Sequence, residues 1–133
     1  MSREILFRGK DTIYQEWIYG DLLTRANYAQ IWQDSDSGKF PASVIPETVS
    51  QFTGLYDKNG VRIWENDIVI IGGNKSFPTV VEFLSGSWQC VRKYTNKGRE
   101  NEYSYLHRLE YDNPNKYEVI GNRFDNSDLL KGE

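Results

Sequence analysis

The run from Val44 to Val69 constrains the fold of this chain most, because it joins alternating apolar residues to a strong turn sequence. Residues 49–55 and 61–64 alternate apolar and polar side chains with period two, which predicts two strands. Between them stands the pair Asn59-Gly60. Such a pair supplies the two positive φ angles of a type I′ turn, so the sequence predicts a β-hairpin closed there.

Short alternating segments separated by turn residues recur along the rest of the chain. The strands predicted from them are residues 4–8, 14–19, 28–33, 49–55, 61–64, 68–71, 79–84, 87–94, 103–111 and 117–121. The polar residues 34–38 are predicted to form a loop, and a short helix holding Leu129 and Leu130 is expected near the end. Many short strands with one apolar face each are typical of a small barrel, so the expected fold class is mainly β with minor α.

Composition limits the domain count and the cellular setting. A chain of 133 residues holds one domain, or two small halves that share a core. Aromatic residues make up 14% of the chain, enough to fill a core that has few aliphatic side chains. The sequence contains no apolar run of about 18 residues and no apolar centre near its start, so neither a membrane span nor a signal peptide is expected. The single Cys90 fits a reducing cytoplasm and is interpreted as a buried, inert thiol.

Several segments carry a family resemblance. They are Arg3–Lys10, Trp17 with Gly20-Asp21-Leu22, Pro46–Val49, Gln51–Leu55, Asp57–Gly60, Ile63–Glu65, Asp67–Val69, Val119–Asn122, Phe124–Asn126 and Leu129-Leu130. Together they resemble the YopX-like proteins of phages and prophages. The resemblance implies an SH3-like barrel encoded on a mobile bacterial element, and therefore a protein of the bacterial host cytoplasm. The family has no established activity, so the resemblance implies no catalytic residues.

The resemblance also suggests how the chain is divided. We expect an N-terminal strand-rich segment over residues 1–43, packed against an SH3-like barrel with a short C-terminal helix over residues 44–133. Asn66 stands where the family usually has glycine, and it is predicted to adopt a positive φ. One shared core is predicted to contain Phe52, Leu55, Ile63, Ile68, Val81, Phe83 and Ile120.

Candidate catalytic residues are few. His107 is the only histidine, and it lies among tyrosines with no serine or cysteine at a recognisable nucleophile position, so a structural role is favoured. The acidic residues Asp57, Glu65 and Asp67 occupy turn positions. They could perform acid–base chemistry or hold Mg²⁺, but hydrogen bonds to their own turn amides are the favoured interpretation. No enzyme activity, cofactor or metal site is expected.

A basic and aromatic group is the one constellation that suggests a ligand. Its members are Trp88, Arg92, Lys93, Tyr94, Lys97, Arg99 and Arg108. Rings that stack on bases, interleaved with cations, suit single-stranded nucleic acid. Along a strand, however, Trp88 and Arg92 share one face while Lys93 lies on the other. The sequence pI near 5.2 also weighs against a nucleic-acid surface.

The sequence therefore predicts a non-catalytic phage or prophage accessory protein that acts by binding. The favoured partner is another protein, with a second copy of this chain as one option. The alternative is nucleic-acid binding through residues 88–108.

Overall fold

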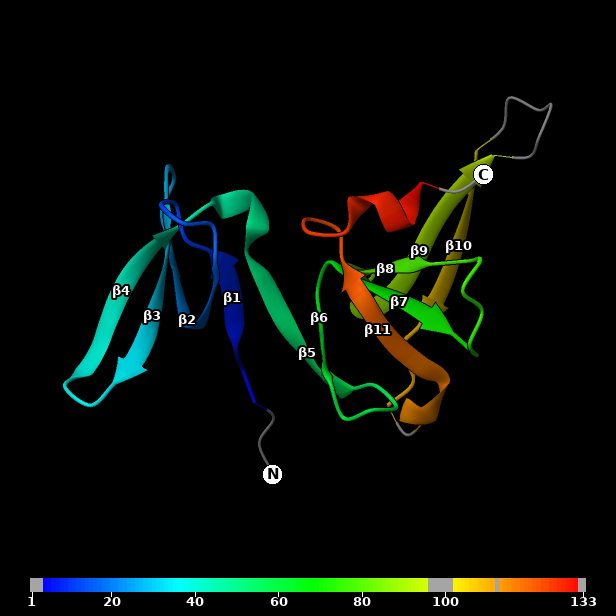
Figure 1. Ribbon diagram of the computed structural model, residues 1–133, viewed down its shortest axis with the longest axis horizontal. Helices are drawn as coiled ribbons and strands as arrows, with labels where there is room; N and C mark the ends of the chain where they lie inside the picture. The colour runs from blue at the N-terminus through cyan, green and yellow to red at the C-terminus, as the bar shows by residue number, and fades with distance from the viewer. Residues whose placement is uncertain (1–3, 96–101, 112, 132–133) are drawn as a thin grey trace. The chain divides into compact units, whose positions relative to one another are not determined.

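The computed structural model describes residues 4–95, 102–111 and 113–131. Within them the strands are β1 (Phe7–Lys10), β2 (Trp17–Thr24), β3 (Ala29–Ser35), β4 (Gly38–Val44), β5 (Ser50–Tyr56), β6 (Arg62–Trp64), β7 (Asp67–Ile71), β8 (Thr79–Leu84), β9 (Ser87–Thr95), β10 (Glu102–Arg108) and β11 (Tyr117–Asn122). Three short 3₁₀ helices accompany them: η1 (Pro46–Thr48), η2 (Pro114–Lys116) and η3 (Ser127–Leu130). The short helix expected at Leu129 and Leu130 is η3 (Figure 1).

The strands form two antiparallel sheets, which confirms the prediction of a mainly β fold. The first sheet has the strand order β4-β3-β2-β1-β5-β6, and the second has the order β10-β9-β8-β7-β11. Among the described residues no ladder joins β10 to β11, so the second sheet is open rather than a closed barrel. No helix within the described part of the chain has both the length and the apolar character needed to cross a membrane.

Two compact units divide the chain within β5, at Met1–Gly54 and Leu55–Glu133. The division lies after the expected boundary at residue 43, because the first part of β5 pairs with β1 through Phe7↔Gln51 and Arg8↔Ser50. The first unit contains a small core of Ala29, Ile31 and Val44. In the second unit the core is larger, and its buried members are Ile63, Val69, Val81, Cys90, Leu109 and Tyr117.

The prediction of one shared core is wrong in two respects. The buried hydrophobic residues form two clusters rather than one, because each of the two compact units buries side chains of its own. Phe83 is 53% exposed because it lies near the end of β8. Its ring meets the ring of Trp88 edge to face, with centroids 5.0 Å apart. The remaining predicted core residues are buried or half-buried: Phe52, Leu55, Ile63, Ile68, Val81 and Ile120.

The predicted hairpin after β5 forms, but its turn type differs from the prediction. Gly60 has a φ of 78°, while Asn59 does not have a positive φ. Asp57 N donates to Val61 O at 2.8 Å and Gly60 N donates to Asp57 O at 3.0 Å, which leaves a three-residue loop. A loop of that length takes a type I turn followed by one left-handed residue, so a single glycine suffices. The two-residue turn with two positive φ angles occurs instead at Ser85-Gly86, between β8 and β9.

One strand was missed because a proline interrupts its pattern. β4 contains Pro41, which lies opposite Trp32 of β3, and it begins directly after the turn at residues 36–37. β4 is the outermost strand of its sheet, so one side of its backbone needs no ladder hydrogen bonds and can accommodate proline.

Asn66 has a φ of 74°, which confirms the predicted left-handed conformation. Its backbone joins two parts of the second unit, since Asn66 N donates to Val81 O at 2.8 Å and Arg123 N donates to Asn66 O at 3.0 Å. Asn66→Gly is expected to leave the free energy of unfolding unchanged or slightly higher. Asn66→Val should lower it by roughly 1–2 kcal/mol, because a β-branched residue is strained at this φ. Urea denaturation of the two variants measures the difference.

Candidate binding surface

The face of the second sheet that carries the core continues into a row of aromatic side chains. In β9 and β10 the residue pairs Cys90↔His107 and Arg92↔Tyr105 lie directly opposite one another, so these four side chains share a face. Cys90 is fully buried in the core, whereas Arg92, Tyr105 and His107 are half-buried. The core face is therefore covered at Cys90 and becomes accessible toward Arg92 and Tyr105.

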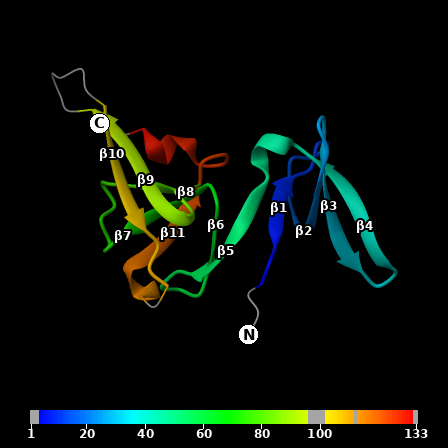
Figure 2. The same cartoon turned by 180° about the vertical axis from the view of Figure 1, so that it is seen from behind.

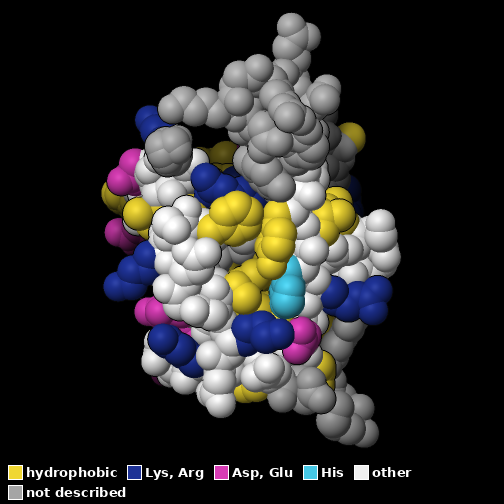
Figure 3. Space-filling model, turned by 90° about the vertical axis from the view of Figure 1, so that its right-hand side faces the viewer, with side chains coloured by type: hydrophobic (Ala, Val, Ile, Leu, Met, Phe, Trp, Pro, Cys, Tyr) yellow, Lys and Arg dark blue, Asp and Glu magenta, His cyan; other side chains and the backbone are white. Residues whose placement is uncertain are grey.

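Successive ring contacts join four residues from three parts of the unit. Phe77 and Tyr105 meet edge to face with centroids 5.1 Å apart, Tyr105 and His107 are parallel at 6.5 Å, and His107 meets Tyr117 at 5.8 Å. We call Phe77, Tyr105, His107 and Tyr117 the aromatic row. Figure 3 shows hydrophobic side chains gathered on this side of the molecule beside the histidine, with charged side chains around them. Offset and edge-to-face contacts hold such rings in fixed orientations.

One end of the row is fixed by hydrogen bonds at the Tyr117 hydroxyl. Glu110 N donates to this oxygen at 2.7 Å, and His107 Nε2 lies 3.0 Å from it. A hydroxyl donates one hydrogen bond and accepts up to two, so Tyr117 can accept from Glu110 N and also bond His107 Nε2, as donor or acceptor according to the histidine tautomer.

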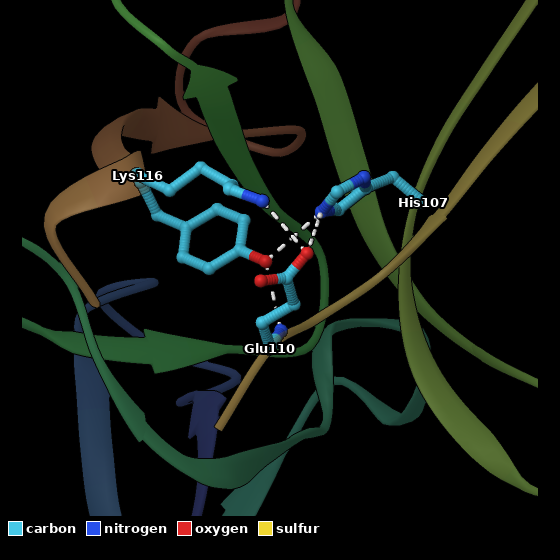
Figure 4. Close-up of polar contacts among 4 residues, drawn as sticks. His107, Glu110 and Lys116 are labelled. Carbon is cyan, nitrogen blue, oxygen red and sulfur yellow. Dashed lines mark hydrogen bonds and ion pairs between the residues drawn. The ribbon is translucent and has the colours of Figure 1, made fainter. Parts of the chain in front are cut away.

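Charged side chains surround the hydroxyl. Lys116 Nζ donates to Glu110 Oε2 at 2.7 Å, and His107 Nε2 lies 3.8 Å from the same oxygen. In Figure 4 these three side chains point toward one another. The hydrogen bond from Lys116 lowers the pKa of Glu110, and burial raises the pKa of Tyr117 to about 12. Burial, reinforced by the charge of Lys116 and opposed by that of Glu110, lowers the pKa of His107.

These pKa shifts predict a pH dependence of stability above the range in which carboxyl groups titrate. Because the pKa of His107 is lower in the folded state, the unfolded chain binds more protons as the pH falls below the ordinary value of 6.5. The free energy of unfolding is therefore expected to fall from pH 7.5 to pH 5.5. His107→Gln, which keeps an acceptor near the Tyr117 hydroxyl and does not titrate, should show a smaller fall in urea titrations at the two pH values. An identical fall in both proteins would contradict this assignment.

A cation covers the other end of the row. The Arg92 guanidinium lies 5.1 Å from the centre of the Phe77 ring, and its Nη1 donates to Pro78 O at 2.9 Å. Arg92 is therefore held by the loop before β8, and it extends the row with a charged plane.

Four of the seven basic and aromatic candidates have side chains that the structure describes, and these four lie on two opposite faces of the sheet. Trp88 and Arg92 share one face as expected; this is the core face, and Trp88 packs against the core. Lys93 and Arg108 lie on the opposite face and are exposed. The backbone of Tyr94 belongs to β9, while Lys97 and Arg99 lie outside the described residues.

The opposite face of β8 and β9 has a different character. A pocket of about 300 Å³ there is lined by residues that include Lys93, Glu82, Arg123 and Leu130. Arg123 Nη2 donates to Glu82 Oε2 at 2.9 Å, so the guanidinium group of Arg123 in this pocket already has a carboxylate partner.

The acidic turn residues bind backbone amides, which confirms the favoured interpretation for two of them. Asp57 is 3% exposed; its Oδ1 accepts from Asn59 N at 2.8 Å and Val61 N at 2.9 Å, and its Oδ2 accepts from Val119 N at 2.9 Å. Asp67 is 2% exposed, and its Oδ2 accepts from Trp64 N at 2.7 Å. Glu65 is half-buried in the turn before Asp67.

The expected buried thiol is confirmed. Cys90 has no exposed surface, and burial raises the pKa of its thiol to about 11. Within the described part of the chain, no three His, Cys, Asp or Glu side chains are grouped so that they could hold a metal ion.

Most members of the aromatic row were missed as functional candidates from the sequence. The sequence pattern identified part of the row, because Tyr105 and His107 stand two residues apart in the predicted strand over residues 103–111 and therefore share a face. Phe77 lies in a loop with no periodic pattern. Tyr117 begins a predicted strand, and nothing in the local sequence indicates that its ring contacts His107.

Comparisons with known proteins identify the family and the fold. A family model described as YopX protein matches residues 6–131. The crystal structure of protein EF1440 from Enterococcus faecalis is similar to this chain with 22% identity and a TM-score of 0.50, and the alignment covers 98% of this chain and 100% of that chain. At this identity the likeness shows the fold alone. A search of curated protein sequences gave no match.

Proposed function

The chain belongs to the YopX family, and we propose that it is a non-catalytic binding module that recognises a protein partner through the aromatic row. One observation carries the proposal: the continuous ring contacts run from Phe77 through Tyr105 and His107, which are half-buried, to Tyr117, which is buried in the core. We propose further that the protein is a phage or prophage accessory protein of the host cytoplasm.

Fixed aromatic side chains suit protein recognition for an energetic reason. Rings that are already ordered lose little conformational entropy when a partner covers them, while they offer a large contact area. Tyrosine, tryptophan and arginine are the residue types that contribute most at the centres of protein interfaces. Tyr105 and Arg92 lie opposite one another at the accessible part of the row.

The cationic side chains beside the aromatic row already have hydrogen-bond or ion-pair partners, and this favours a protein partner over nucleic acid. Lys116 is paired with Glu110 at 2.7 Å, and Arg92 donates to a backbone carbonyl. Among the described cations of β9, β10 and η2, phosphate binding would have to displace these contacts or use Lys93 and Arg108, which lie on the other face. Nucleic-acid affinity depends mainly on cations that neutralise phosphates along one surface.

The chemistry of the row and of the nearby core supports a non-catalytic role. The Tyr117 hydroxyl already bonds Glu110 N and the ring nitrogen of His107, and its pKa near 12 keeps it protonated at neutral pH. Burial keeps the Cys90 thiol protonated as well. General-base and nucleophilic catalysis need a group that is free to exchange a proton with a substrate.

Truncation of one ring tests the proposal. We expect Tyr105→Ala to fold, as judged by circular dichroism, and to lose the complexes that the tagged wild-type chain forms in bacterial cells. Tyr28→Ala is the matched control, because Tyr28 is an exposed tyrosine (48%) in the other unit. Retention of the same complexes by both variants would contradict the proposal. Binding to labelled single-stranded DNA that falls steeply with added salt and is lost in Arg92→Ala would favour the nucleic-acid alternative.

A further inference from the structure

The segment after β11 covers part of the face of β8 and β9 that lies opposite the core. Val80 and Val91 form a cross-strand pair on this face, and both are buried. Arg123 and Leu130, which follow β11, line one pocket together with these two valines. In Figures 1 and 2 the red helix η3 lies beside β8 and β9. The cover is incomplete, because the pocket that remains has a volume of about 300 Å³.

Half of the residues that line this pocket are apolar. They are Pro78, Val80, Val91 and Leu130. A ligand that places a hydrocarbon chain or ring against them removes apolar surface from water, which favours binding. A volume of about 300 Å³ is at the lower limit of the cavities that hold small molecules. The pocket therefore suits a small ligand with an apolar part.

The charged residues of the pocket leave an excess of one positive charge. The guanidinium of Arg92 does not contribute to it, because it lies over the Phe77 ring on the core face. Arg123 and Glu82 form an ion pair at 2.9 Å and balance one another. Lys93 is exposed, and its ammonium has no hydrogen-bond or ion-pair partner within the part of the chain that the structure describes. Lys93 is therefore available to an anion.

Arg123 also keeps hydrogen-bonding capacity beyond its ion pair. A guanidinium has five N–H donors, so a single carboxylate does not use all of them. Nη2 of Arg123 donates to Glu82 Oε2, whereas its buried Nε has no acceptor among the described residues. The Arg123 side chain is 37% exposed, so it is accessible from solvent. Glu82 thus holds the guanidinium in place while other donors remain for a ligand.

We propose that this pocket binds a small monocarboxylate, an organic acid with one carboxylate on a short apolar chain or ring. The carboxylate binds Lys93 and Arg123, and the apolar part packs against Val80 and Val91. One negative charge matches the single excess positive charge of the pocket, whereas Glu82 repels a second one. This inference does not rest on the proposed function, because the aromatic row lies on the other face of the sheet.

Four probes separate the contributions of charge and apolar surface. Hexanoate carries both features, acetate only the charge, hexanol only the chain, and hexylamine the chain with the opposite charge. In NMR titrations of the whole chain, hexanoate should bind saturably and shift the methyl signals of Val80, Val91 and Leu130. Acetate and hexanol should each bind about tenfold more weakly or worse, and hexylamine weakest of all. No saturable binding of hexanoate, or equal binding of hexanol or hexylamine, would overturn the inference.

A pair of lysine variants tests the position of the carboxylate. Lys93→Gln should raise the Kd of hexanoate by about threefold or more and leave that of hexanol unchanged, because only the carboxylate loses its partner. Lys75→Gln is the matched control, since Lys75 is an exposed lysine of the same unit that does not line the pocket. Equal Kd values of hexanoate in the two variants would also overturn the inference. Tyr105→Ala should bind hexanoate as the wild type does, so the pocket and the aromatic row are tested separately.

Discussion

Gly20→Ala is expected to lower the free energy of unfolding by roughly 3 kcal/mol or more, one of the two largest effects that we predict. A Cβ at Gly20 would lie 2.1 Å from the backbone oxygen of Trp32 and 3.2 Å from Ile31 Cγ2. The carbonyl belongs to β3, which is held to β2 by the pairs Asp21↔Trp32 and Leu22↔Ile31. The added methyl group can be accommodated only if the two strands separate.

The matched control for Gly20→Ala is Thr24→Ala, at an exposed position at the end of the same strand. It should change the free energy of unfolding by about 0.5 kcal/mol or less. Urea denaturation followed by tryptophan fluorescence measures both variants. If Gly20→Ala were as stable as the wild type, the close approach of β2 and β3 at this position would be wrong.

Asp57→Ala is expected to lower the free energy of unfolding by roughly 3–4 kcal/mol. The substitution leaves three backbone amides, those of Asn59, Val61 and Val119, without their shared carboxylate acceptor. The bond to Val119 joins positions 62 residues apart, so its loss also loosens the contact between the hairpin and β11. Buried donors without a partner are among the few causes of large destabilisation.

Two further variants separate the role of the carboxylate from a general effect of removing charge. Asp57→Asn keeps one acceptor oxygen and should be destabilised by less than Asp57→Ala. Asp34→Ala removes an exposed carboxylate that contacts Lys39, and it should change the free energy of unfolding by about 0.5 kcal/mol or less. Equal effects of all three substitutions would contradict the proposed role of Asp57.

The sequence predicted most of the strands because their apolar faces are local patterns. The alternation in residues 79–84 and 117–121 corresponds closely to β8 and β11. Asn66 was predictable for a similar reason, since its conformation is set within one turn. β4 was not predictable, because its strand character comes from pairing with β3 and its proline is tolerated only at a sheet edge.

The candidate surface depended on contacts that sequence periodicity does not encode. Phe77 and Tyr117 reach Tyr105 and His107 from segments that are distant along the chain. Period two placed Trp88 and Arg92 on one face correctly, but it could not show that the core half-covers Trp88. The division into two cores likewise depends on packing between segments that are distant along the chain rather than on any single segment.

The central claim is that the aromatic row contacts a protein, and site-specific photo-crosslinking tests it most directly. The photoreactive amino acid p-benzoylphenylalanine would replace Tyr105 in one chain and Tyr28 in a control, and both would be irradiated in bacterial cells that produce the protein. We predict a discrete crosslinked protein product from position 105 that is absent from position 28. Identical products from both positions, or none from position 105, would contradict the claim.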